Sequence, residues 1–249
     1  MRKTIPKKYF IESDVFLAHK PVGISSFGLL KKVRTRLGIK KIGHAGTLDP
    51  LASGLMIVGI GKGTKKMTQY LGLPKIYLAE VLLGKSTTTG DQEGDPLETK
   101  DVFLQDFSKE KLEETLKEML GEFEFPAPLY SAVKVNGKPL YRYAREGKEP
   151  PFIPTKKMLI KNIQLLDFFQ KENFLILKIR VEVGSGTYIR TLAEKIGEKL
   201  SLPASLENLY RIRIGEYSDY NAFSFESRGK CSKALLYDKI RILLKNLFK

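Results

Sequence analysis

The sequence is poor in the residues that build disulfide bonds and metal sites. Its 249 residues include one cysteine, Cys231, so an internal disulfide is excluded. The two histidines, His19 and His44, do not belong to any cluster with metal-ligand spacing. We therefore expect no metal centre.

Long apolar runs are also missing. No stretch reaches the roughly 18 uncharged apolar residues that a membrane-spanning helix needs. The first residues, MRKTIPKKYFIESD, lack the apolar centre of a signal peptide. We expect a cytoplasmic protein that does not enter a membrane. With 42% hydrophobic residues, the chain can bury a sizeable core as one large domain or two small ones.

Acidic residues are few compared with basic ones. The chain has 43 lysines and arginines against 28 acidic residues, which gives a formal net charge of +15. Such an excess favours a polyanionic partner, because each neutralised phosphate releases counterions. In KVNGKPLYRYAREGK, residues 134–148, cations alternate with aromatic rings that can hold an irregular RNA strand. Nucleic acid is therefore the expected partner.

Hydrophobic periodicity and turn residues predict the elements. Strands are expected at 15–21, 54–61, 76–84, 158–169, 174–183 and 209–217. Helices are expected at 26–38, 64–72, 109–120 and within 184–200, followed by an amphipathic helical tail at 230–249. Either Ser25 or Ser26 can cap the first helix, and Asn136-Gly137 predicts a tight hairpin. The pattern indicates one α+β domain with a mainly antiparallel sheet flanked by helices.

The stretch GHAGTLDPLASGLMIVGIGKGTKK, residues 43–66, first suggests a phosphate-binding loop followed by a helix. The spacing of its glycines does not match that of a phosphate-binding loop, because neither Gly54 nor Gly59 is followed, after four residues, by Gly-Lys-Ser/Thr. Glycines that permit a tight bend and close packing explain the second half of the stretch more simply. A phosphate-loop nucleotide hydrolase is therefore the weaker of the alternative functions.

Asp49 stands within the same stretch, directly before Pro50. The proline holds Asp49 extended, so the carboxylate is presented by a stiffened loop. Local evidence alone favours an ordinary turn residue that accepts backbone N–H bonds. The surrounding leucines change this interpretation, because a carboxylate among apolar groups requires a nearby cation, and a carboxylate nucleophile needs the same arrangement.

Four blocks of the sequence resemble the tRNA pseudouridine synthase B (TruB) family, in the same order and over about residues 17–217. They are KPVGISS, GHAGTLDPLASGLMIVGIGKGTK, YSAVKVNGKPLYRYAREG and GSGTYIRTLAEKIGEKL. The resemblance implies a pseudouridine synthase catalytic domain that isomerises uridine 55 in the T loop of tRNA without a cofactor. It also implies that Asp49 is the nucleophile. Whether Asp49 first attacks the base or the ribose stays open.

The resemblance assigns further residues to the site. Tyr77 would stack on the target base and take part in removing its proton, and Arg190 would pair with Asp49 and orient it. His44 would enter the position that the flipped nucleotide vacates. The remaining candidates for substrate binding are Lys20, Asp91, Lys134, Tyr188 and Leu209, with Asp91 expected near Arg190 or RNA-binding groups.

The chain departs from the family pattern at its start and its end. Leu17-Ala18-His19-Lys20-Pro21 replaces the usual Leu-Asp-Lys-Pro, and Thr88 replaces an aspartate. We expect a catalytic domain at 1–217 and a short helical extension at 218–249, without the C-terminal PUA domain that relatives commonly carry. A monomer that binds the T stem-loop and needs no protein partner is expected. The other alternative is an RNA-binding or chaperone protein without turnover.

Overall fold

The computed structural model describes residues 5–224, so the tail predicted to be helical lies outside the described residues. Its strands are β1 (Phe10–Glu12), β2 (Val15–Lys20), β3 (Ile42–His44), β4 (Ser53–Ile60), β5 (Lys75–Leu83), β6 (Lys85–Thr87), β7 (Pro96–Thr99), β8 (Gly121–Pro126), β9 (Lys134–Val135), β10 (Lys138–Pro139), β11 (Thr155–Lys171), β12 (Phe174–Val183), β13 (Ala204–Ile214), β14 (Tyr217–Ser218) and β15 (Phe223–Ser224). The helices are α1 (Ser26–Leu37), α2 (Met67–Leu71), α3 (Lys109–Lys117), α4 (Leu140–Arg145) and α5 (Ile189–Lys199), with 3₁₀ turns η1 (Lys7–Tyr9), η2 (Gly61–Lys66), η3 (Leu104–Asp106) and η4 (Asp219–Asn221).

One large sheet runs through the described residues, with the main order β1-β2-β4-β13-β5-β12-β11-β8. Most neighbours are antiparallel, whereas β13 pairs with β4 and β15 pairs with β2 in parallel. The long strands β11 and β12 form the hairpin that their sequence predicts. The expected α+β class with a mainly antiparallel sheet is confirmed.

Local signals account for α1. The Ser25 hydroxyl accepts a hydrogen bond from the Gly28 N–H at 3.0 Å, and Gly38 ends the helix in the left-handed region with φ 66°. Leu29 and Val33 are buried along one stripe. The opposite face carries three exposed cations, Lys31, Lys32 and Arg34. The helix therefore presents a basic face to solvent.

Two other expectations needed adjustment. The helix predicted for 109–120 ends at Lys117, because Met119 and Leu120 donate to carbonyls three residues back and tighten the last turn. Residues 64–72 form a 3₁₀ turn followed by the short helix α2 rather than one helix. Gly59 permits a close approach, since a Cβ there would meet the Gly63 carbonyl oxygen at 2.6 Å.

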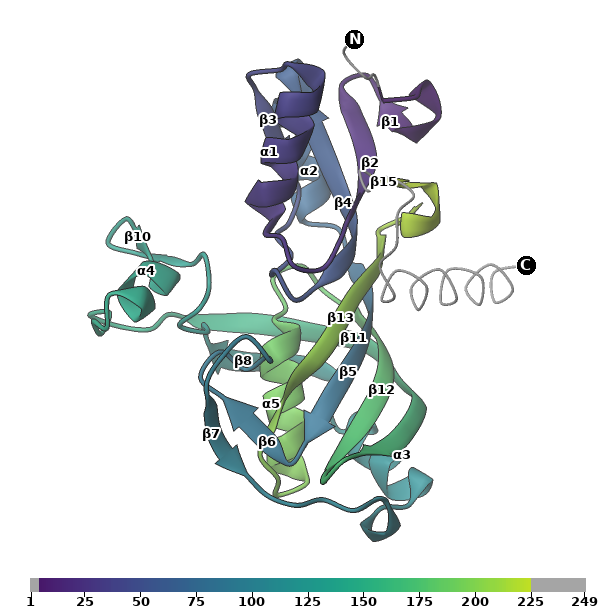
Figure 1. Ribbon diagram of the computed structural model, residues 1–249, viewed down its shortest axis with the longest axis vertical. Coiled ribbons are helices and arrows are strands. Elements are labelled where there is room, and N and C mark those ends of the chain that lie inside the picture. Colours follow the sequence, from purple (N-terminus) through teal and green to yellow (C-terminus); the bar gives the residue numbers. More distant parts are fainter. Residues whose placement is uncertain (1–4, 225–249) are drawn as a thin grey trace.

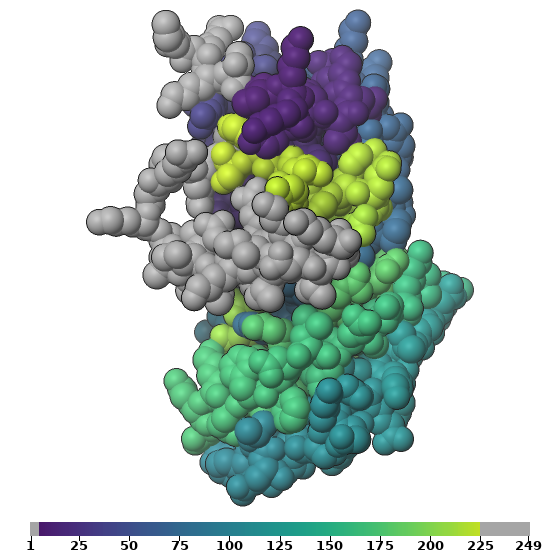
Figure 2. Space-filling view, turned by 90° about the vertical axis from the view of Figure 1, so that its right-hand side faces the viewer, coloured from purple at the N-terminus to yellow at the C-terminus, as the bar shows by residue number. Residues whose placement is uncertain are grey.

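The sheet joins two lobes, which Figure 1 shows one above the other. The upper lobe contains β1 to β4, α1, α2 and β15, the lower lobe contains α5 and the sheet from β5 to β12, and β13 runs from one lobe to the other. Figure 2 shows the purple N-terminal strands beside the yellow-green residues that end at Ser224, in agreement with the pairing of β15 with β2. The main core cluster is continuous across both lobes, from Phe16 and Leu29 to Leu83 and Ile196.

A segment that we call the arm, residues 127–154, projects from the lower lobe and carries α4 and the β9–β10 hairpin (Figure 1). Its base is closed by the pairing of β8 with β11 and by the hydrogen bond from the Ala127 N–H to the Pro154 carbonyl, 2.9 Å. The predicted hairpin turns at Asn136 and Gly137, with φ of 50° and 80°. In the lower lobe, α5 packs against β13 and β5, and its first turn lies next to the Asp49 loop.

Candidate active site

Asp49 lies on the loop between β3 and β4, at the junction of the lobes. The Ala52 N–H donates to the Asp49 carbonyl at 3.1 Å, and the Gly23 N–H donates to the Pro50 carbonyl at 2.8 Å. The loop is closely held, with Leu48 only 3% exposed, yet the Asp49 side chain is 42% exposed. A fixed backbone therefore presents a carboxylate that a substrate can reach.

Arg211 of β13 supports this loop from beneath. Its guanidinium donates to the carbonyls of Leu55 at 2.7 Å, Thr47 at 3.3 Å and Gly46 at 3.2 Å. The Arg211 side chain is almost wholly buried. Within the described residues these carbonyl dipoles, and no ion pair, compensate its charge. A Cβ on Gly54 would lie 2.3 Å from the Arg211 carbonyl oxygen, so a glycine there lets β4 approach β13.

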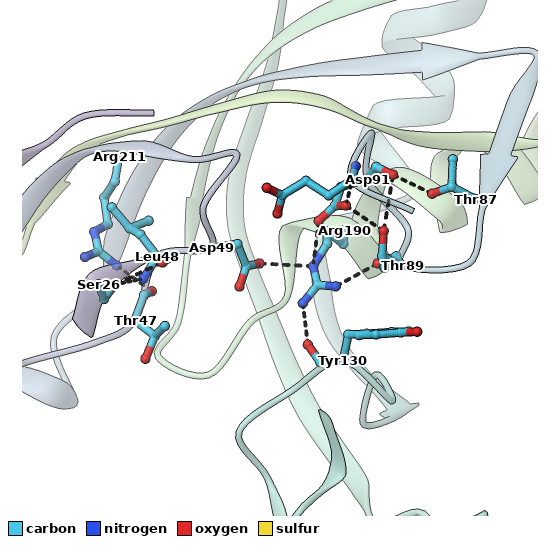
Figure 3. A network of polar contacts seen from close by, with 11 residues as sticks. Ser26, Thr47, Leu48, Asp49, Thr87, Thr89, Asp91, Tyr130, Arg190 and Arg211 are labelled. Atoms are coloured by element: carbon cyan, nitrogen blue, oxygen red, sulfur yellow. Dashed lines mark hydrogen bonds and ion pairs between the residues drawn. The ribbon is translucent and has the colours of Figure 1, made fainter. Parts of the chain in front are cut away.

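Ser26 holds the loop from the helix side. Its Oγ accepts a hydrogen bond from the Leu48 N–H at 2.8 Å and donates one to the Leu48 carbonyl at 2.9 Å. Figure 3 shows Ser26 and Arg211 close together on the same side of Asp49. Leu48, the residue before Asp49, is therefore held through both its backbone N–H and its carbonyl.

Lys20 has no exposed surface at the site. Its ammonium donates to the carbonyls of Pro21 at 2.9 Å and Ile24 at 2.6 Å, and its side chain is fully buried. Burial lowers the pKa of Lys20 to about 8, against the opposing effect of the nearby Asp49 charge. A direct substrate contact is not available to a side chain in this position. We therefore interpret Lys20 as a support of the Asp49 loop.

Arg190, in the first turn of α5, approaches Asp49 from the lower lobe. Its Nε lies 3.1 Å from the Asp49 Oδ2 and 3.7 Å from the Asp91 Oδ2. Arg190 is 6% exposed and Asp91 is 2% exposed. The expected contacts of Arg190 with both aspartates are therefore present, and the pair leaves one face of Asp49 open.

The same guanidinium contacts two further segments. Nη1 donates to the Thr89 carbonyl at 2.7 Å, and Nη2 donates to the Tyr130 carbonyl in the arm at 2.8 Å. Figure 3 shows these contacts converging on Arg190. One side chain thus joins α5, the Asp49 loop, the turn between β6 and β7, and the arm.

Asp91 is itself held in place by its own turn. Its Oδ1 accepts hydrogen bonds from the Thr89 hydroxyl at 2.6 Å and from the Glu93 N–H at 3.0 Å. Burial raises the pKa of Glu93, and the negative charges of Asp91 and Asp49 raise it further. The carboxyl groups of Asp49, Asp91 and Glu93 therefore lie near the cations Arg190 and Lys20.

Tyr77 and Leu209 lie on the sheet face below the loop. Tyr77 of β5 stands directly opposite Arg211 of β13, and Leu209 comes two residues earlier on β13, so all three share one face. Tyr77 and Leu209 are each 7% exposed. Among the described residues no hydrogen bond joins Tyr77 to Asp49. The sheet therefore offers an aromatic and an aliphatic wall beside the carboxylate.

The remaining candidates are spread around this centre. Tyr188 is the residue before α5, and burial raises its pKa, with Arg190 opposing and Asp49 adding to that shift. His44 ends β3, and burial lowers its pKa, with Arg211 lowering it further, so the ring is neutral. Lys134 is exposed on the arm, away from the other candidates in sequence and in its contacts.

Sequence reasoning missed several residues that shape the site. Arg211 had a signal, because it follows Leu209 by two positions on a strand and therefore shares its face. Ser26 was considered only as a helix cap. The Tyr130 contact is made by a backbone carbonyl, which leaves no side-chain signal, and Glu93 lies in a turn without a distinctive pattern.

A search of residues 5–224 finds no group of three or more metal-ligating side chains placed to hold an ion. In that same part of the chain no helix is both long and apolar enough to cross a membrane.

Comparison with known proteins agrees with this description. Residues 34–189 match the family described as TruB family pseudouridylate synthase (N terminal domain). A tRNA pseudouridine synthase B of Staphylococcus aureus (strain JH9) is 46% identical over 208 residues, which cover 82% of this chain and 67% of the relative.

Two solved structures share the fold. The chain superposes on a Cbf5-Nop10-Gar1 complex with a TM-score of 0.61 and 26% identity, covering 85% of this chain and 52% of that one. It also superposes on a chain of an H/ACA RNP bound to a substrate RNA containing 2′-deoxyuridine, with a TM-score of 0.59 and 24% identity. The match covers 84% of this chain and 50% of that chain. The chain therefore spans about half the length of these structural relatives.

Proposed function

This chain belongs to the TruB family of pseudouridylate synthases, and we propose that it converts uridine 55 in the T loop of tRNA to pseudouridine, with Asp49 as nucleophile. Residues 1–217 would form the catalytic domain. The observation that carries the proposal is a half-exposed carboxylate on a fixed loop, 3.1 Å from a buried arginine. The 46% identity to a tRNA pseudouridine synthase B supports the choice of RNA.

The reaction is an isomerisation and needs no oxidant. The bond from ribose C1′ to N1 of the base breaks, a bond from C1′ to C5 forms, C5 loses a proton and N1 gains one. Asp49 supplies the electron pair that opens the sequence. Arg190 orients the carboxylate and offsets its charge through a charge-assisted contact to one oxygen, while the other oxygen stays available.

The surrounding residues would hold the flipped nucleotide. Tyr77 offers a ring on which the uracil stacks and a phenol for proton transfer, and Leu209 closes the apolar wall. Tyr188 lies beside the Asp49 and Arg190 charges. His44, neutral on the loop side, would occupy the space that the base leaves in the RNA.

The arm and α1 would bind the T stem-loop. In the arm, Lys138 lies over the Tyr143 ring at 4.2 Å and Arg145 lies over the Tyr141 ring at 5.6 Å. Rings and cations in this arrangement bind bases by stacking and phosphates by charge. Lys134 lies in the same segment. The helix α1 contacts the Asp49 loop through Ser26 and presents its basic face to solvent.

The test is incubation of the purified chain with an unmodified tRNA transcript, followed by nucleoside analysis for pseudouridine. We expect stoichiometric formation at position 55, none with Asp49→Asn, and unchanged formation with Asp106→Asn, an exposed aspartate of η3. Binding of the transcript without any pseudouridine would refute the proposal and support the RNA-binding alternative. Modification at another uridine would refute the assignment of position 55.

A further inference from the structure

Lys75 is a buried cation that the proposed chemistry does not use. It begins β5 at the junction of the lobes and is 5% exposed (Figure 1). Its ammonium donates to the Leu71 carbonyl at 2.6 Å and to the Ser185 hydroxyl at 3.2 Å. An ammonium has three N–H donors, so one of them has no acceptor among the described residues.

A second buried cation lies beside it. Arg211 also lowers the pKa of Lys75, after the larger effect of burial. A Cβ on Gly46 would lie 3.6 Å from the Arg211 Nη1 and 4.0 Å from the Lys75 Cε. Three of the five Arg211 donors are used by backbone carbonyls. The Lys75 and Arg211 side chains therefore both lie close to Gly46, on the Asp49 loop.

No carboxylate forms an ion pair with either cation within residues 5–224. Two like charges buried side by side without a counterion are unfavourable, because burial removes their hydration and each repels the other. An anion placed between them and the solvent would relieve that cost. The arrangement is therefore suited to a ligand that brings its own negative charge.

The position of Lys75 on β5 indicates that this anionic ligand is a phosphate group of the RNA. Lys75 and Tyr77 are two residues apart on one strand, so they share a face and are separated by about 7 Å. This separation is comparable to that between the base and the phosphate of one nucleotide. If the target uracil stacks on Tyr77, a phosphate that flanks it lies within reach of Lys75.

We propose that Lys75 binds a phosphodiester group that flanks the target uridine and thereby holds the flipped nucleotide against Tyr77. The inference rests on the proposed function, since it assumes an RNA substrate whose base enters this site. It assigns Lys75 a substrate-binding role in addition to its hydrogen bonds to Leu71 and Ser185.

The test is a double-mutant cycle between the protein and the RNA. Binding of a T stem-loop RNA is compared for the wild type, Lys75→Gln and Lys75→Arg, with either flanking phosphate replaced by a neutral methylphosphonate. We expect Lys75→Gln to raise Kd about tenfold and to lower the log-log salt slope by about 0.7 to 0.9. One methylphosphonate should weaken the wild type and Lys75→Arg about tenfold but Lys75→Gln less than twofold.

The matched control is Lys109→Gln, which removes an equal charge from the exposed start of α3 in the lower lobe. It should leave the effect of each methylphosphonate unchanged. Equal losses in the wild type and Lys75→Gln at both phosphates would overturn the proposal. If Lys75→Gln does not fold, the wild-type protein still tests the proposal. A loss of affinity below twofold for the methylphosphonate at each of the two positions would also overturn it.

Pseudouridine formation by the wild type on the unmodified stem-loop is measured separately. Turnover without coupling between Lys75 and a phosphate refutes only the role of Lys75. Coupling between Lys75 and a phosphate in binding, without turnover, refutes the proposed function but still supports the phosphate site.

Discussion

Replacing Arg190 by methionine would remove the charge at the centre of the site while keeping much of the side-chain volume. The change breaks the contacts to Asp49 and Asp91 and leaves the Thr89 and Tyr130 carbonyls without their donor. Asp91 then remains as a buried carboxylate without its cation. The variant should therefore lose both stability and activity, for reasons that can be separated.

The stability cost follows from burial. Removing one partner of a buried ion pair costs about 3–5 kcal/mol. The Asp49 contact adds little, about 0–1 kcal/mol, because that side chain is 42% exposed and regains water. Asp91 keeps its bonds from the Thr89 hydroxyl and the Glu93 N–H, which holds the total near 4 kcal/mol. At about 2–4 °C per kcal/mol, Tm should fall by about 8–16 °C.

Melting curves and pseudouridine assays test this reasoning together. Arg190→Met should lower kcat/KM by on the order of 10²-fold or more, and the loss should not add to that of Asp49→Asn if the two residues act as a unit. Replacing Asp91 by asparagine in the Arg190→Met background should recover part of Tm, because it removes the unpaired charge. The half-buried Arg180 of β12 serves as control, and Arg180→Met should cost under about 1 kcal/mol.

Two results would refute the reasoning. A Tm within about 2 °C of the wild type would contradict the estimate for the buried pair. Wild-type kcat/KM in Arg190→Met would remove Arg190 from the reaction.

Four further predictions concern the loop, the cations and the RNA. Asp49→Asn should abolish turnover and leave the Kd for stem-loop RNA within a few-fold; pseudouridine at normal rates would contradict its role as nucleophile. Ser26→Ala should cost about 1–3 kcal/mol in urea unfolding and lower kcat, because both Leu48 backbone groups lose their partner. Ser25→Ala, which removes only a helix cap, should cost about 1 kcal/mol without changing kcat. Burial, with the neighbouring Arg211 charge, lowers the pKa of Lys75 from its usual 10.5 to about 8. The unfolded chain then binds more protons between these values, so stability should rise from pH 8 to pH 10 by about 2 kcal/mol more in the wild type than in Lys75→Gln, as measured by urea unfolding at each pH. Alanine at the basic positions of α1 should flatten the salt dependence of Kd more than it changes kcat, and an unchanged slope would show that α1 does not contact RNA. These positions are Lys31, Lys32, Arg34 and Arg36.

Elements with strong local signals were predictable from the sequence. The cap and the terminal glycine bound α1, Asn136-Gly137 defines a hairpin, and apolar alternation marks β11 and β12. Short strands such as β3, β6 and β7 were not predicted, since they are held by neighbours and not by their own pattern. The early end of α3 reflects a tightened last turn that residue propensities do not encode.

The same distinction between local signals and tertiary contacts applies to the active site. The sequence by itself predicted that Pro50 holds Asp49 extended, and the family motifs pointed to Arg190 as its partner. Only the tertiary structure decided that Ser25 caps α1 while Ser26 binds Leu48, that Lys20 is buried, and that Arg211 supports the loop. Arg211 and Thr47 are separated by 164 positions. Local sequence sets which donors and acceptors a segment offers, but their pairing depends on the packing of β13 against β4, which no single segment contains.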